Sequence, residues 1–461
     1  MADPSPARPR LAERVRDSII RGPVAPTTDQ ERKQAIVRNL ILHLRPVRVP
    51  AATLRYTHTF GLGGMSLVLV LLLIATGMLL RFGYEPAPGA AYDSIVRMQD
   101  TVTFGRLVRS IHYWSANFLV VIVVLHLLRT YFTGAYHPPR QFNWVIGLAL
   151  LGCVVASNFT GYLLPWDQRS YWAITISTGM LEYVPAVGGW LQRLARGGAD
   201  IGQRTLTTFY TLHTTVVPTL LLVLMAFHFW RVRKARGVVV PRRPDEDVAP
   251  ESERVLTLPH LLARELAVAL VLLAVIMVCS ALFAAPLGDA ANPGMSPNPA
   301  KAPWYFMGFQ ELLLHFHPLF AVVVLPLAAI LALVALPYYP YARDTAGIWF
   351  GSVTGRRLAV TAAGAAIAIT PALILLDEYV VDLPSWLPWL PPSVSNGLLP
   401  VLALGAALGA GLAWLRRRYA ASGDELVQTL FVFLTVAFLT LTAVGEWFRG
   451  AGMALVWPWG R

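Results

Sequence analysis

Four histidines lie in apolar segments of this 461-residue chain, in two pairs with similar spacing. His112 and His126 are 14 residues apart, and His213 and His228 are 15 residues apart. At 100° per residue, these spacings return to within about 40° and 60° of one helical face, with the rings roughly 21–22 Å apart along the axis. Two such helices running antiparallel would bring His112 opposite His213 and His126 opposite His228.

Two facing imidazoles can occupy both axial positions of an iron porphyrin, so this pattern predicts two stacked, bis-histidine hemes. A hydrogen-bonded structural role is the alternative for any single buried histidine. Four of them at two matched depths of a membrane favour the ligand interpretation. Zinc fits poorly, because no acid or cysteine lies near either pair.

Four glycines repeat the 14-residue spacing on two further segments: Gly63 and Gly77, then Gly147 and Gly161. Isolated glycines in membrane helices usually indicate close helix packing. Their match to the histidine spacing favours a second explanation, clearance for two macrocycles.

Two arginines lie one helical turn beyond the histidines of the first pair-bearing segment. Arg109 precedes His112 and Arg129 follows His126. Both are placed to pair with anionic heme propionates, or simply to extend their charge to the membrane surface. Position alone does not separate the two.

The segments that carry these residues are long enough to cross a membrane. Hydrophobic residues make up 56% of the chain, and they gather in blocks of about 20 residues, the length that spans a bilayer. We therefore predict an all-α, polytopic transmembrane bundle of nine spans, the first four forming a di-heme four-helix bundle. The spans are 61–82, 107–130, 143–164, 209–230, 264–284, 319–337, 358–376, 397–415 and 426–446.

The positive charge of the chain follows the membrane topology. The net charge is +12, with eleven Lys and Arg between Arg8 and Arg55, a cluster at 231–243 and another at 416–418. These groups fall on alternate loops, as expected for cytoplasmic loops. This distribution predicts a cytoplasmic N-terminus in a bacterial inner membrane and argues against nucleic-acid binding.

Four regions are expected. Residues 1–59 form a basic cytoplasmic segment in which Ile36, Leu40, Ile41 and Leu44 predict a surface helix over 30–48. The di-heme domain covers 60–235, a cytoplasmic linker 236–262, and a second domain with extra C-terminal spans 263–450. Cys153 and Cys279 lie inside apolar blocks and are interpreted as buried hydrophobes.

Three motifs resemble the Rieske/cytochrome b family. Residues 161–176 read G-Y-L-L-P-W-D-Q-R-S-Y-W-A-I-T-I, and residues 202–216 read G-Q-R-T-L-T-T-F-Y-T-L-H-T-T-V. The His213–His228 spacing is similar to that of the photosynthetic split type. A half similar to subunit IV follows the linker, where residues 298–310 read N-P-A-K-A-P-W-Y-F-M-G-F-Q.

The chain departs from the family at two places. The family's quinol-site element is Pro-Glu-Trp-Tyr, whereas this chain has Ala302, Pro303, Trp304 and Tyr305, without the glutamate that accepts a proton. We predict Glu311 as the replacement, with His315 and His317 as further candidates. Gly61 stands where the split type attaches a third heme through cysteine, so no covalent third heme is expected.

The resemblance implies a cytochrome b subunit of a proton-translocating quinol:cytochrome c oxidoreductase. Its cofactors would be two non-covalent b hemes. Quinol would be oxidised at the outer face, beside Pro165, Trp166, Trp304, Tyr305 and Glu311, and quinone reduced at the inner face near Arg233 and Lys234. The implied partners are a Rieske iron–sulfur protein, a c-type cytochrome, quinone, the lipid membrane and a second copy of the chain.

Two alternatives are kept. A di-heme membrane anchor of another quinone-linked dehydrogenase would also carry the histidines, but such anchors are shorter and do not need the P-W-D-Q and P-W-Y loops. A proton-coupled transporter is the non-redox alternative. Transporters favour broken helices and buried acids near the midplane, a pattern that this sequence lacks.

Overall fold

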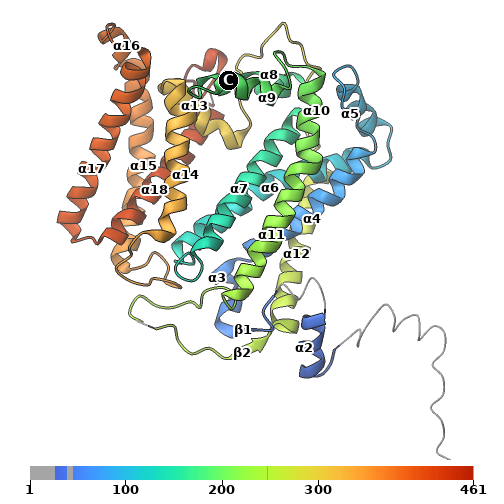
Figure 1. Cartoon of the computed structure of the whole chain (residues 1–461), viewed down its shortest axis with the longest axis vertical. Helices are drawn as coiled ribbons and strands as arrows, with labels where there is room; N and C mark the ends of the chain where they lie inside the picture. Colours follow the sequence, from blue (N-terminus) through green and yellow to red (C-terminus); the bar gives the residue numbers. More distant parts are fainter. Residues whose placement is uncertain (1–25, 39–44, 247, 460–461) are drawn as a thin grey trace, which may run out of the picture.

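The computed structural model describes residues 26–38, 45–246 and 248–459. Within these ranges, nine helices are long and apolar enough to cross a membrane (Figure 1). Each coincides with one predicted span, so the predicted all-α polytopic class is confirmed. The nine are α4 (Leu62–Arg81), α6 (Gly105–Phe132), α7 (Gln141–Leu163), the run Gln203–Lys234, α12 (Thr257–Leu282), the run Leu319–Tyr338, α15 (Val353–Tyr379), the run Val394–Tyr419 and α18 (Gly423–Trp447).

These helices bury one face against each other and turn large apolar side chains outward. On α4, Leu71, Met78 and Leu79 are all more than half exposed, while Leu69 is fully buried. Such outward faces suit hydrocarbon rather than water. The chain is therefore a multi-pass membrane protein.

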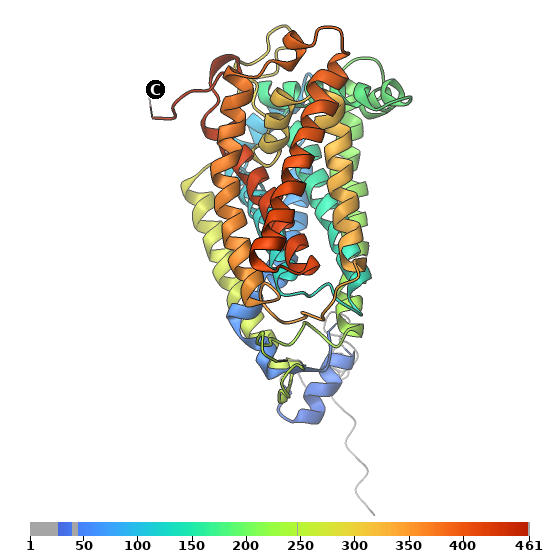
Figure 2. The same cartoon turned by 90° about the vertical axis from the view of Figure 1, so that its left-hand side faces the viewer.

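The helices form two groups that lie side by side (Figures 1 and 2). In the first group, α4 packs on α6, α7 packs on α11 (Val217–Lys234), and α12 covers α6 and α4. In the second group, α18 packs between α15 and α13 (Met307–His315). Helix α14 (Leu325–Ala335) contacts α7 and joins the two groups.

Three of the long runs contain a π-helical turn, a helix widened by one residue. These are η4 (Leu212–Val216), η6 (Leu319–Val324) and η8 (Val394–Leu398). In each run a proline, Pro218, Pro326 or Pro400, lies two residues after the turn. Proline lacks an N–H and crowds the carbonyl four residues earlier, so a wider turn ahead of it keeps the helix continuous.

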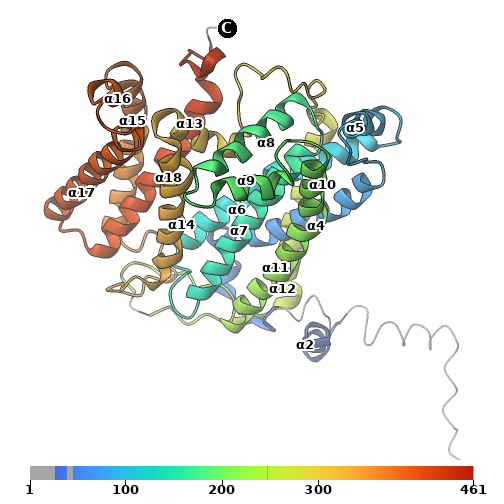
Figure 3. The ribbon, with the colours of Figure 1, turned by 45° about the horizontal axis from the view of Figure 1, so that its top comes forward.

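Short helices cap the two ends of the bundle, and Figure 3 shows the upper ones. We call the ends the α8 end and the β1 end. The α8 end carries α5 (Ala91–Asp100), α8 (Gln168–Met180), η3 (Leu181–Tyr183), α9 (Gly188–Arg196), η5 (Trp304–Phe306), α13, α16 (Leu383–Trp386) and η9 (Ala451–Met453). The β1 end carries α2 (Asp29–Arg38), β1 (Arg48–Pro50), η2 (Ala51–Leu54), α3 (Tyr56–Thr59), β2 (Arg254–Leu256) and η7 (Leu336–Tyr338). The last helices, α10 (Gln203–Thr211) and α17 (Leu399–Tyr419), belong to the long runs.

The predicted linker, 236–262, is tied to both groups of helices. Its β2 strand pairs antiparallel with β1, the Val239 carbonyl is 2.8 Å from His58 Nε2, and the Arg242 N–H donates to the Gly347 carbonyl at 3.0 Å. The described residues of this segment therefore connect the two groups of helices. Of the surface helix predicted over 30–48, the first part is present as α2, with Ile36 buried. Residues 45–47 are not helical and Arg48 begins β1, so that end of the prediction is wrong. Leu40, Ile41 and Leu44 lie outside the described residues.

Candidate functional site

The first histidine pair comes together between α6 and η4. The rings of His112 and His213 have centroids 6.1 Å apart at an interplanar angle of 76°. Two metal–nitrogen bonds of about 2 Å plus the ring radii span roughly 6 Å. The separation is therefore the one that two axial ligands of a single metal require.

Hydrogen bonds fix which nitrogen of each ring faces its partner. His213 Nδ1 donates to the Ser157 carbonyl at 2.9 Å. His112 Nδ1 lies 2.9 Å from Thr76 Oγ1, whose own proton is donated to the Leu72 carbonyl at 2.7 Å. His112 Nδ1 is thus the donor as well. Both rings keep the Nε2 lone pair for a ligand, an orientation typical of metal-binding histidines.

Each predicted glycine lies against one histidine ring. The glycines of α4 contact the histidines of α6, and the glycines of α7 contact the histidines of the η4–α11 helix. A Cβ added at Gly77 would be 3.2 Å from His112 Cε1, and one at Gly161 would be 2.5 Å from His213 Cε1. For the second pair, the corresponding distances are 3.4 Å from Gly63 to His126 and 3.7 Å from Gly147 to His228. The glycines therefore make room for the imidazoles; clearance for macrocycles stays a prediction.

The π turn η4 explains the unequal histidine spacings. His213 lies inside this turn, whereas α6 is α-helical throughout between His112 and His126. A π turn takes up one extra residue, so 15 residues on the η4–α11 helix cover the rotation that 14 residues cover on α6. Both histidines of this helix consequently face α7, at Gly161 and Gly147.

A cavity of about 1250 Å³ opens beside the first pair, at the α8 end. It is lined by His112 and His213, by Gly77 and Gly161, and by Pro165, Trp304 and Tyr305. The structure thus brings three of the predicted quinol-site residues to the same space as the first pair. Burial raises the pKa of the Tyr305 hydroxyl above its ordinary value, so this group stays protonated.

Trp166 does not line this cavity within the described part of the chain. It takes a left-handed backbone conformation, with φ 52°, and its side chain packs among Leu163, Ile174 and Leu206. Its carbonyl accepts a hydrogen bond from Ala291 N–H at 3.2 Å. Trp166 therefore anchors the turn that presents Pro165.

Hydrogen bonds hold the 300–306 loop against its neighbours. Trp304 Nε1 donates to Asn117 Oδ1 of α6 at 2.7 Å. Gln310 of α13 accepts from Ala302 N–H and donates to the Ala300 carbonyl, both at 2.7 Å. The cavity wall is thus fixed from two helices of different groups.

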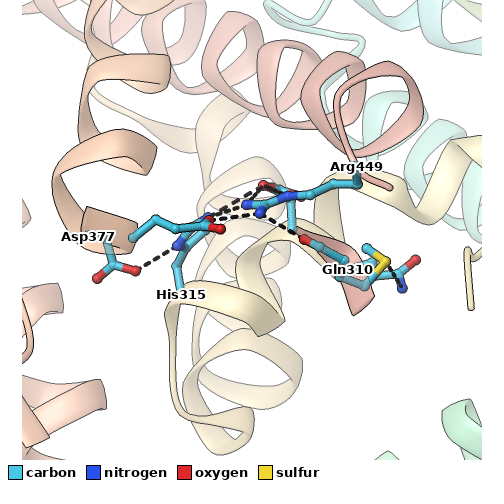
Figure 4. A network of polar contacts seen from close by, with 7 residues as sticks. Gln310, His315, Asp377 and Arg449 are labelled. Carbon is cyan, nitrogen blue, oxygen red and sulfur yellow. Dashed lines mark hydrogen bonds and ion pairs between the residues drawn. The ribbon is translucent and has the colours of Figure 1, made fainter. Parts of the chain in front are cut away.

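A polar network around Arg449, His315 and Asp377 lies next to this loop (Figure 4), and Glu311 belongs to it. Its carboxylate is fully buried and accepts from Arg449 Nη2 at 2.5 Å and from Nε at 3.0 and 3.2 Å. Arg449 also pairs with Glu378 at 2.7 Å, and His315 contacts Asp377 at 2.7 Å and Glu311 at 3.4 Å. The structure does not bring Glu311 into the cavity.

The network shifts both titratable groups at its centre. Burial would raise the pKa of Glu311, but hydrogen bonds from His315 and Arg449 hold it below its ordinary value. Burial would likewise lower the pKa of His315, but the hydrogen bonds to Asp377 and Glu311 raise it to about 9. His317, the other candidate, packs edge-on against Tyr183, with centroids 5.9 Å apart.

Comparison with known proteins decides the family. A sequence model described as Cytochrome b/b6/petB matches residues 49–236. Cytochrome b6 of Chlamydomonas reinhardtii is 45% identical over 182 residues, which are 40% of this chain and 84% of that protein. Cytochrome b6 of Synechococcus sp. (strain WH7803) is also 45% identical over 182 residues, 40% of this chain and 83% of that protein. The chain belongs to the cytochrome b/b6 family.

A solved structure extends the likeness in fold to the second group of helices. A chain of a hyperthermophilic respiratory Complex III superposes with a TM-score of 0.63 over 90% of this chain and 98% of that chain, at 23% identity. The fused arrangement predicted from residues 298–310 is therefore consistent with both comparisons. As a member of the family, the chain is a heme b-binding electron-transport protein of a membrane.

The residues of the first pair fit a heme, and one buried group near the second pair is suited to a heme propionate. The first pair has the required separation, and its Nε2 atoms point away from their hydrogen bonds. Near the second pair, Arg129 donates through Nε to the His58 carbonyl at 2.8 Å, while its Nη2 is buried without a hydrogen bond to any described residue. Buried donors of this kind need an acceptor, and a propionate would supply one.

Arg109 has partners in the protein itself. Its guanidinium donates to the carbonyls of Ala285 and Pro286 at 2.8 and 2.7 Å and to Gln99 Oε1 at 2.8 Å. It therefore tethers the loop after α12 to α6. Arg109 also lines the cavity beside the first histidine pair. Its pairing with a heme propionate stays a prediction.

The predicted quinone-reduction residues point to different places at the β1 end. Arg233 lines a basic pocket of about 450 Å³ together with Lys33, Arg48, Arg236 and Arg254. The ammonium of Lys234 instead lies 4.4 Å above the Trp230 ring. Neither the pocket nor the ring stack includes a histidine of the second pair.

Sequence reasoning missed three residues that shape the site: Asn117, Arg449 and Glu446, which also lines the cavity. Asn117 lies one helical turn past Tyr113 on a predicted span, and a polar amide there was an available signal. Glu446 is the last residue of the final predicted span and Arg449 follows it. Nothing local links them to Lys301 and Glu311, which lie 145 and 138 positions earlier.

Proposed function

We propose that this chain is the cytochrome b subunit of a quinol:cytochrome c oxidoreductase, oxidising quinol in the cavity at the α8 end. The observation that carries this proposal is the composition of the cavity wall. The wall holds the rings of His112 and His213 and also Pro165, Trp304 and Tyr305. A quinol bound there would lie in the same cavity as the ligands of the heme that would accept its electron.

The four histidines hold two non-covalent b hemes, and these supply one-electron transfer across the membrane when bound. The chain itself fixes the ligand rings through Thr76 and Ser157. It holds the quinol pocket through the Trp304–Asn117 hydrogen bond and encloses it among apolar helices, which limits the access of water. Hemes held by the two histidine pairs would carry electrons from the α8 end to the β1 end, where a quinone would be reduced near Arg233 and Lys234.

The charge distribution supports a cytoplasmic β1 end. Arg231, Arg233 and Lys234 end α11 there, and Arg416, Arg417 and Arg418 end α17 there. Carboxylates at 377, 378 and 382 lie near the opposite end. By the positive-inside rule the N-terminus faces the cytoplasm of a bacterial inner membrane, so protons are taken up at the β1 end and released at the α8 end.

The resemblance supplies the partners in this proposal. A Rieske iron–sulfur protein would take one electron of each quinol and pass it to a c-type cytochrome, while the heme held by the first histidine pair would take the second. The assembly is a homodimer.

Redox-titrated absorption spectra of the isolated complex test the two-heme arrangement. Wild type should show two b-type components, and His213→Ala and His228→Ala should each remove or shift a different one. Quinol-dependent reduction of cytochrome c should fall with either substitution. A single component in wild type, or full activity in both variants, would refute the proposal.

A further inference from the structure

Quinol oxidation in this cavity needs a base, and the chain has Pro303 where the resembling element has its glutamate. Among the described residues, only two carboxylates line the cavity, those of Asp167 and Glu446. A carboxylate base in this cavity must therefore come from an element other than the 300–306 loop.

Asp167 is already used to hold the backbone. Its Oδ1 accepts from Ser170 N–H at 2.9 Å as the N-cap of α8, and its Oδ2 accepts from Gly288 N–H at 2.9 Å. Both oxygens are therefore already engaged by backbone donors. Glu311 is excluded in the same way by Arg449, and it also lies outside the cavity.

Glu446 is placed differently. It comes one residue before the end of α18 and is half-buried. Among the described residues, its carboxylate has no hydrogen bond or ion pair; only its main-chain carbonyl is engaged, by Lys301 Nζ at 2.7 Å. Its charge is felt by the hydroxyls of Tyr113 and Tyr162, which also line the cavity.

The position of Glu446 is fixed by close packing of α18 on α13. A Cβ at the neighbouring Gly445 would be 2.9 Å from Met307 Cε, and one at Gly308 would be 2.8 Å from Phe438 Cε2 and Thr442 Oγ1. With the Lys301 hydrogen bond, this packing sets the end of α18 beside η5. The last membrane helix thus places a carboxylate near the 300–306 loop, which has none of its own.

We propose that Glu446, supplied by the final membrane helix, accepts a proton from quinol in this cavity, in place of the glutamate missing at position 303. The inference rests on the proposed function. A quinol O–H bond breaks, and its proton forms an O–H bond with the Glu446 carboxylate. Oxidation to quinone releases two protons and two electrons. The electrons go to the iron–sulfur partner and the first histidine pair, and the second proton leaves on the partner's side.

The groups that face Glu446 set its surroundings. The hydroxyls of Tyr113 and Tyr162 lie within electrostatic reach of its carboxylate, and Lys301 binds its main-chain carbonyl. Tyr305, Asp167 and Arg169 line the same cavity. Once protonated, Glu446 is a neutral acid beside these groups, and it must lose the proton before the next turnover. The rate of quinol oxidation is therefore tied to its ionisation.

The test measures cytochrome c reduction by the isolated complex with decylubiquinol and with menadiol, between pH 5 and 9. Glu446→Gln should slow turnover by roughly tenfold or more, the lower end of general-base effects, and should remove the acidic limb of the pH profile. Both hemes should remain in its reduced-minus-oxidised spectrum. Glu446→Asp, which keeps a carboxylate, should retain the acidic limb at a reduced rate.

Glu182→Gln is the matched control, since Glu182 is an exposed carboxylate at the same end of the molecule. It should match wild type. If Glu446→Gln also matches wild type at every pH, or if Glu446→Asp lacks the acidic limb, Glu446 is not the base. Wild type that fails to reduce cytochrome c with either quinol would instead overturn the proposed function.

Discussion

Gly161 of α7 lies so close to the imidazole of His213 that an added Cβ would come within 2.5 Å of Cε1. Gly161→Ala should therefore push His213 out of line with His112, and the first heme should be lost or its spectrum shifted. Difference spectra and potentiometric titration measure this. The cause is steric, because the ring lies directly against the α7 backbone and its Nδ1 is held by the Ser157 carbonyl of the same helix.

Gly147→Ala provides the control on the same helix. Its Cβ would be 3.7 Å from His228 Cε1, which is ordinary van der Waals contact, so both b-type components should persist. If Gly147→Ala lost one b-type component while Gly161→Ala kept both, the predicted order of the two steric effects would be wrong.

Arg449 and Glu311 form a buried pair, with both side chains at most 1% exposed. Arg449→Gln should destabilise the complex by about 3–5 kcal/mol, because it leaves Glu311 charged and unpaired. The double variant Glu311→Gln/Arg449→Gln should recover much of that loss. Thermal or denaturant unfolding in detergent measures both.

Arg97→Gln is the comparison for the Arg449 prediction, since the Arg97–Glu85 pair is more than half exposed. Exposed pairs contribute little, so its unfolding should match wild type. Equal losses for Arg97→Gln and Arg449→Gln would contradict the role of burial.

His315 gives the complex a pH-dependent stability. Its pKa is raised from 6.5 to about 9 by Asp377 and Glu311, so the folded state binds its proton more tightly than the unfolded state. The stabilisation is complete below about pH 6.5 and is lost as pH rises through 9. The midpoint of thermal unfolding should fall between pH 7 and 10.

His315→Gln should flatten that part of the pH curve, whereas His260→Gln, at an exposed histidine on the β1 side of α12, should leave it unchanged. Persistence of the wild-type slope in His315→Gln would show that another group titrates.

The sequence predicted the spans and the histidine and glycine positions because these depend on geometry within one helix. Hydrophobic length determines where a span lies, and residue spacing determines which face a side chain occupies. His112 and Gly77 meet because two locally defined faces oppose each other. The π turn at His213 was not predicted, although its proline was visible, since a widened turn leaves no periodic signal of its own.

The quinol cavity was predicted only in part, for the same physical reason. Pro165, Trp304 and Tyr305 carry recognisable motifs, whereas the surroundings of Glu311 depend on how α18 packs against α13. That packing depends on Gly308 and Gly445, and a glycine in the sequence does not indicate which helix will pack against it. Glu446 and Arg449 therefore acquired their roles from tertiary contacts that no local pattern encodes.

Asn117 gives the last prediction. Its Oδ1 is the acceptor of the Trp304 indole N–H at 2.7 Å, so Asn117→Leu leaves that donor without a partner at the cavity wall. A lost hydrogen bond of this kind costs about 1–3 kcal/mol, and the wall that binds quinol should loosen. We expect KM for decylubiquinol to rise by roughly fivefold or more, with both hemes retained. Trp304→Phe, which removes the same N–H but leaves Asn117 in place, should raise KM similarly. An unchanged KM in both would mean that this hydrogen bond does not shape the pocket.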